Sequence, residues 1–143
     1  MFIRRRHMHV HRLACAVIAL SFIGVTATPF AFARIAYNTI DAVVSVNDEG
    51  RHLVVTGPIA CTASERAYLR VTVTQRITGT MAEGYTLIVC TGAIQQWEVH
   101  ATAQGKETFE PGSATAVAVA RTTTRAETTD AHQWLVAVTL VDE

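Results

Sequence analysis

Cysteine is the residue type whose number and spacing imply the most definite chemistry in this chain. Cys61 and Cys90 have 28 residues between them, and the third cysteine, Cys15, lies in an apolar N-terminal run. In an oxidising compartment such a pair predicts one disulfide, whereas in a reducing compartment it predicts two free buried thiols. A bridge that closes a loop of this length stabilises a fold by roughly 3–4 kcal/mol. Because the N-terminal segment has the order of a secretory signal peptide, as described below, we expect an oxidising compartment and one Cys61–Cys90 disulfide.

Residues that could catalyse a reaction or bind a metal form no recognisable pattern. Nucleophilic catalysis needs a base beside the nucleophile, and the chain has no G-x-S-x-G turn to present a serine. Zinc needs spacings such as C-x-x-C or H-E-x-x-H, which are also absent from the sequence. The candidate residues outside the N-terminal segment are His52, His100, His132, Asp48, Glu49, Glu107 and Glu110. We expect no catalytic residue, no metal site and no cofactor, and so we expect that the protein is not an enzyme.

The segment Met1–Ala33 has the order of a secretory signal peptide. Four arginines lie near its start, a mostly apolar run from Leu13 to Val25 follows, and Ala31-Phe32-Ala33 gives an A-x-A pattern. We expect this signal helix to be removed before Arg34 and the protein to be secreted. An uncleaved leader is the alternative, and it would be about long enough to anchor the domain outside a membrane. The alternating histidines from His7 to His11 belong to the charged start of the leader.

The net charge of the domain differs from that of the whole chain. The leader holds four of the twelve Lys and Arg residues and none of the twelve Asp and Glu residues, so residues 34–143 have a formal net charge of −4. An acidic domain with Lys106 as its one lysine does not attract a phosphate backbone, which excludes nucleic acid as a partner. Weak self-repulsion favours a soluble monomer.

Apolar and polar residues alternate through most of residues 34–143. In Ala67–Thr74, Ala, Leu and Val occupy one face while Tyr, Arg and Thr occupy the other. This period of two predicts half-buried strands, and turn residues separate seven or eight of them. The expected strands are 40–46, 52–61, 67–74, 85–90, 95–103, 114–121 and 132–141, with 122–130 as the longest loop.

Many short strands and one cysteine pair favour a single antiparallel β-sandwich of immunoglobulin-like type over residues 34–143. A small β-barrel is the alternative. A true immunoglobulin domain fits less well, because its two cysteines lie much further apart in sequence than Cys61 and Cys90 do.

The order of several short motifs resembles that of an uncharacterised family of small secreted actinobacterial proteins. The motifs are G-x-x-x-C at Gly57–Cys61, Val71–Gln75, C-T-G-x-x-Q-x-W at Cys90–Trp97, and Phe109-x-Pro-Gly. They span nearly all of residues 34–143. The resemblance implies secretion and a β-sandwich with one cysteine pair, and it implies no particular activity.

Aromatic residues are the best candidates for binding. Trp97 and Trp134 share the parity of neighbouring valines, so we expect both in the core. Tyr68 has the opposite parity to Leu69, which places it on the surface beside Arg70, and tyrosine with arginine is common at interfaces. The predicted binding surface is Tyr68, Arg70 and Tyr85.

The sequence thus predicts a secreted or envelope-associated, non-catalytic binding or structural module. Its partner would be an extracellular protein or an envelope component. A protease inhibitor, using loop 62–65 or loop 91–95, and a small-ligand carrier are the alternatives.

Overall fold

The computed structural model describes residues 34–47 and 49–143, and these fold as strands and connecting loops. The expected all-β class is therefore confirmed, while the predicted signal peptide lies outside the described residues. Among the residues described, no helix is long and apolar enough to span a bilayer. The strands are β1 (Ile35–Asn38), β2 (Val43–Asn47), β3 (His52–Cys61), β4 (Arg66–Gln75), β5 (Thr80–Val89), β6 (Ile94–Gln104), β7 (Gly112–Thr124) and β8 (Glu127–Asp142).

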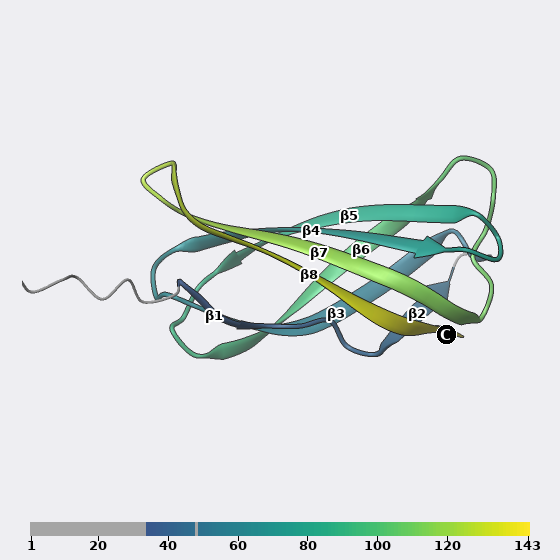
Figure 1. Ribbon diagram of the computed structural model, residues 1–143, viewed down its shortest axis with the longest axis horizontal. Helices are drawn as coiled ribbons and strands as arrows, with labels where there is room; N and C mark the ends of the chain where they lie inside the picture. The colour runs from purple at the N-terminus through teal and green to yellow at the C-terminus, as the bar shows by residue number, and fades with distance from the viewer. Residues whose placement is uncertain (1–33, 48) are drawn as a thin grey trace, which may run out of the picture. The chain divides into compact units, whose positions relative to one another are not determined.

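Seven of these strands wrap around one core as a closed barrel (Figure 1). The order is β3-β2-β8-β7-β4-β5-β6, and β6 pairs back to β3 from His52↔Thr102 to Ala60↔Ile94. Each neighbouring pair is antiparallel except β2 and β8, which run parallel. The predicted immunoglobulin-like sandwich is therefore wrong, and the alternative, a small barrel, is the architecture observed. The alternation of apolar and polar residues cannot distinguish a sandwich from a barrel, because in both folds one face of every strand points toward the core.

The barrel is closed by short ladders near one end and diverges at the other. The β2–β8 ladder covers Val43–Val46, and the β5–β6 ladder covers Met81–Glu83. Beyond these joints, no ladder links β5 to β6 or β8 to β1 among the described residues. β1 and β2 instead pair one after the other with the same strand, β3. Between them, the Asp41 N–H donates a hydrogen bond to the Thr56 carbonyl of β3 at 2.9 Å.

Apolar side chains from all of the strands fill the barrel. Four of the five buried inward positions of β7 are alanines, Ala114, Ala116, Ala118 and Ala120, and the fifth is Thr122. Trp97 is buried, as predicted, whereas Trp134 packs against the core but is only partly buried.

The predicted loop 122–130 is wrong. β7 and β8 run to Thr124 and Glu127, and a two-residue turn joins them at Arg125 and Ala126. Both turn residues have positive φ, 51° and 69°, which is the conformation of a type I′ hairpin turn. The Asn-Gly pair that is typical of such a turn is missing from the sequence here, so the run of polar threonines predicts a loop.

Candidate functional site: a tyrosine–arginine face

The alternation of β4 produces one polar, aromatic outer face. Ala67 and Leu69 point into the barrel and are fully buried, so Arg66, Tyr68 and Arg70 point outward. Tyr68 keeps 48% of its surface exposed even though it lies in the middle of a sheet. A central strand thus presents a tyrosine between two arginines.

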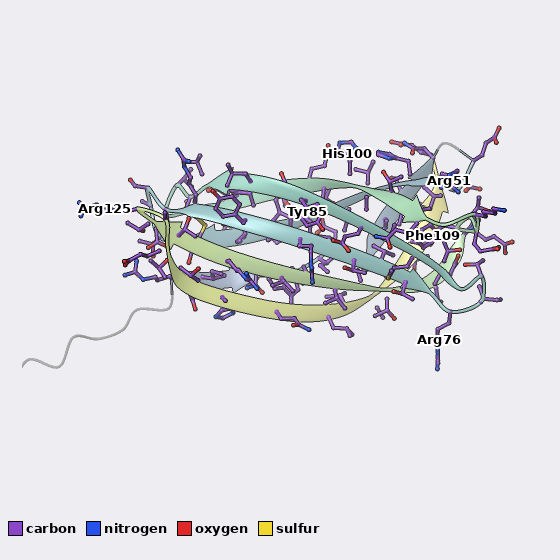
Figure 2. The ribbon with its side chains drawn as sticks, turned by 90° about the horizontal axis from the view of Figure 1, so that it is seen from above. Arg51, Arg76, Tyr85, His100, Phe109 and Arg125 are labelled. Atoms are coloured by element: carbon purple, nitrogen blue, oxygen red, sulfur yellow. A yellow bond between two sulfur atoms is a disulfide. The ribbon has the colours of Figure 1, made fainter. Side chains whose placement is uncertain are left out.

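Neighbouring strands extend this face on both sides. On β5, Leu87 lies opposite Tyr68 and Tyr85 lies opposite Arg70. The predicted surface residues Tyr68, Arg70 and Tyr85 are therefore adjacent. Tyr85 is 67% exposed, and Figure 2 shows it on the outer side of the sheet. Its hydroxyl donates a hydrogen bond to the Glu83 carboxylate, two residues away on the same face.

β7 contributes the residues that sequence reasoning missed. Arg121 lies opposite Tyr68, and Val119 lies opposite Arg70. Arg125 stands at the hairpin tip that follows. Arg66 could have been found from its parity with Tyr68, but Arg121 and Arg125 could not, because nothing local in the sequence pairs β4 with β7.

The side chains enclose two shallow depressions that share Tyr68. The first has a volume of about 300 Å³ and is lined by Tyr68, Leu69, Arg70, Tyr85, Thr86, Val119 and Arg121. The second has a volume of about 470 Å³ and is lined by Ser64, Arg66, Tyr68, Thr123, Thr124, Arg125 and Ala126. We call the outward residues Arg66, Tyr68, Arg70, Tyr85, Leu87, Val119, Arg121 and Arg125 the tyrosine–arginine face.

Positive charge on this face exceeds the negative charge of Glu83, the carboxylate beside Tyr85. None of the guanidinium groups of Arg66, Arg70, Arg121 and Arg125 lies in an ion pair with a described carboxylate. These four arginines are half of the eight basic residues in 34–143, although that region has a net charge of −4. The charges are therefore segregated, and one face of an acidic domain is cationic.

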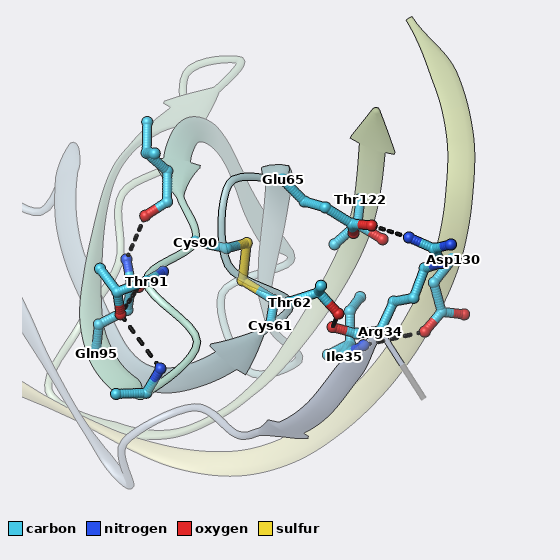
Figure 3. Close-up of a disulfide and its surroundings, with 12 residues drawn as sticks. Arg34, Ile35, Cys61, Thr62, Glu65, Cys90, Thr91, Gln95, Thr122 and Asp130 are labelled. Atoms are coloured by element: carbon cyan, nitrogen blue, oxygen red, sulfur yellow. Dashed lines mark hydrogen bonds and ion pairs between the residues drawn. A yellow bond between two sulfur atoms is a disulfide. The ribbon is translucent and has the colours of Figure 1, made fainter. Parts of the chain in front are cut away.

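The diverging end of the barrel is held by covalent and ionic contacts (Figure 3). Cys61, at the end of β3, is disulfide-bonded to Cys90, which follows β5, and so the predicted disulfide is confirmed. Nearby, Arg34 pairs with the Glu65 carboxylate, whose side chain is only 4% exposed. Thr129 of β8 donates its hydroxyl to the same carboxylate at 3.1 Å. Asp130 of β8 accepts the Ile35 N–H at 3.1 Å, so polar contacts replace the missing β1–β8 ladder.

The two predicted inhibitory loops are short and held by internal hydrogen bonds. In 62–65, Glu65 N–H donates to the Thr62 carbonyl at 3.2 Å. In 91–95, the Thr91 N–H and hydroxyl both donate to Gln95 Oε1, at 2.9 and 2.8 Å. Both loops flank the disulfide (Figure 3).

The three histidines of the described residues, His52, His100 and His132, do not assemble with a serine or a thiol. His132 lies beside Asp130 on β8, with 3.6 Å between Nε2 and Oδ2, while His52 and His100 lie on β3 and β6. Within the described residues, no cluster of three or more His, Cys, Asp or Glu side chains could hold a metal ion.

No family model matches the chain, and no curated protein matches it.

Proposed function

We propose that this protein is an exported, non-catalytic binding domain whose tyrosine–arginine face holds an acidic segment of an extracellular or envelope protein. The observation that carries the proposal is the group of four arginines around Tyr68 that lack ion-pair partners in the described chain. An acidic segment supplies the missing carboxylates.

The apolar part of the face supports a protein partner over a simple polyanion. Tyr68, Tyr85 and Leu87 are 48%, 67% and 50% exposed, and they lie next to the arginines. Burying such side chains stabilises a complex by about 25 cal/mol per Å² of apolar area, before the costs of association. A polyanion would use only the cations. Tyrosine and arginine are also the residue types most often found at interface hot spots.

Rigidity of the backbone supports this role as well. β4 pairs along most of its length with both β5 and β7, so Tyr68 and its neighbours stand on a fully hydrogen-bonded sheet. A rigid sheet presents its side chains with little loss of backbone entropy when the partner binds.

Peptide binding tests the proposal. The probe is a fluorescent ten-residue peptide of alternating glutamate and leucine with a central phenylalanine, and its anisotropy is followed at low and high salt. We expect Tyr68→Ala and Arg121→Glu each to weaken binding by at least tenfold, and added salt to weaken it because the charges are exposed. Arg76→Glu is the matched control, since Arg76 is exposed in the β4–β5 turn and lies outside the face (Figure 2).

Two comparison peptides make the outcome decisive. A peptide with lysine in place of glutamate should not bind, and polyglutamate of equal length should bind at least tenfold more weakly. Equal binding of polyglutamate would show a site for polyanions in general and contradict the proposal. Binding that is unchanged in both face variants, with their folds verified by circular dichroism, would also overturn it.

Export is the second part of the proposal, and the order of residues in Met1–Ala33 together with the Cys61–Cys90 bridge supports it. Mass spectrometry of the protein from culture medium should give a chain that begins at Arg34. An intact chain found only in the membrane fraction would instead support the anchored alternative.

A further inference from the structure

Two histidines on adjacent strands form a close pair on the outer surface of the barrel. His52 of β3 and His100 of β6 both point outward, His52 beside the buried Leu53 and His100 between the buried Val99 and Ala101. In the antiparallel register, His52 lies opposite Thr102 and Val54 lies opposite His100, so the two histidines are diagonal neighbours. Their rings stack with centroids 5.1 Å apart, and 2.9 Å separates His52 Nε2 from His100 Nδ1.

Glu98 determines which nitrogen of His100 carries the proton. The Glu98 carboxylate lies 2.9 Å from His100 Nε2, so this nitrogen is the donor and carries hydrogen. His100 Nδ1 then has an unshared electron pair and accepts the Nε2–H of His52. A carboxylate on the far nitrogen of an imidazole is the arrangement that orients metal-binding histidines and makes them more basic.

We propose that His52 Nε2 and His100 Nδ1 form a two-histidine binding site for Cu²⁺ or Ni²⁺, with Glu98 as the residue that orients His100. Two imidazole nitrogens on adjacent strands, with the remaining positions open to water, favour a metal that accepts a mixed set of nitrogen and oxygen ligands. Tetragonal coordination by nitrogen and oxygen is typical of Cu²⁺ and Ni²⁺.

Metal binding requires a change of tautomer and a rotation of the imidazole rings, because the two nitrogens point at each other in the hydrogen bond and must turn toward a shared metal. The proton on His52 Nε2 leaves to solvent while another adds at Nδ1, so the ring stays neutral and Nε2 is freed for the metal. The metal loses two water ligands and keeps the others, because the described chain supplies no third ligand. The His100 and Glu98 side chains are 59% and 57% exposed, so the site is open to solvent.

Thermal unfolding with added metal tests the proposal, because a metal held between β3 and β6 stabilises only the folded state. Cu²⁺ or Ni²⁺ in excess should raise Tm of the full-length protein by about 5 °C, and Zn²⁺ should raise it less. His52→Ala and His100→Ala should each abolish the shift, and Glu98→Gln should lower the metal affinity about tenfold. His132→Ala is the matched control and should keep the shift.

Histidines in the N-terminal segment do not affect the comparison of Tm shifts between variants. His7, His9 and His11 are present in every variant, so they cancel in the comparison. Electron paramagnetic resonance of bound Cu²⁺ should show two nitrogen ligands that are lost in His52→Ala. An unchanged Tm in the wild-type protein, or a shift that persists in both His52→Ala and His100→Ala, would overturn the proposal. This inference is independent of the tyrosine–arginine face.

Discussion

Cys61 and Cys90 join the ends of β3 and β5, two strands that share no hydrogen-bonded ladder. Their Cα atoms are 5.4 Å apart, at the end of the barrel where β5 and β6 have separated. Backbone pairing closes one end of this barrel, while the disulfide and the Arg34–Glu65 pair hold the other.

Loss of the disulfide should therefore destabilise the whole barrel. We expect Cys61→Ala/Cys90→Ala to lower the free energy of unfolding by roughly 3–4 kcal/mol, because the loop of 29 residues regains its entropy in the unfolded chain. Urea denaturation measures this change. A reducing agent should have the same effect on the wild-type protein and no further effect on the double variant; sensitivity of the double variant to reductant would contradict the assignment.

The ion pair at the same end should matter because Glu65 is buried. Arg34→Ala leaves a carboxylate that is 4% exposed without its cation, and we expect a loss of about 2 kcal/mol. The Arg34 side chain is 44% exposed, which keeps the loss below that of a fully buried pair. Arg34→Lys should retain most of the stability.

A double-mutant cycle isolates this interaction. In a Glu65→Gln background, Arg34→Ala should cost much less, because no buried charge is left unpaired. Equal costs in the two backgrounds would show that Arg34 acts through packing alone.

Gly84 marks the point where β6 crosses close to β5. A Cβ atom at this position would lie 2.3 Å from the His100 carbonyl oxygen and 2.6 Å from Val99 Cγ1. We expect Gly84→Ala to destabilise the fold by about 2 kcal/mol or more, since the backbone of β6 must move. Gly79→Ala is the comparison: φ is +73° there with no atom within 4 Å, so only the backbone strain of about 1 kcal/mol applies. A smaller loss at Gly84 than at Gly79 would disprove the close crossing.

The β7–β8 turn offers a substitution that should stabilise the protein. Ala126 has φ of 69°, a conformation that glycine adopts without the penalty paid by a side chain. Ala126→Gly should raise the free energy of unfolding by about 0.5–1 kcal/mol, measured by thermal denaturation. Ala131→Gly, in the exposed part of β8, should lower it by a similar amount. If both variants are destabilised alike, the turn does not have the left-handed conformation.

Strand positions and the disulfide were predictable because they depend on local pattern and on residue counts. The alternation of Ala67–Thr74 defines the face of β4, which in turn places Tyr68 and Arg70 on the surface. The prediction of a loop at 122–130 is wrong, because the turn there is formed by Arg125 and Ala126 in conformations that these residue types rarely adopt.

The candidate site was predictable only in part. Tyr68 and Arg70 follow from parity within one strand, but Arg121 joins them only because β7 pairs with β4. The same holds for the histidine pair, since His52 and His100 are 48 positions apart and meet only through the β3–β6 ladder.

By itself, the sequence determined an all-β domain, one disulfide and the outward face of each strand, since side chains alternate along any strand. The tertiary structure alone decided that the sheet closes into a barrel and which arginines gather around Tyr68. Both depend on which strands lie side by side. The two short ladders that close the barrel, β2 with β8 and β5 with β6, leave no local signal in the sequence. Strand pairing is set by the packing of the whole core and not by neighbouring residues in the chain.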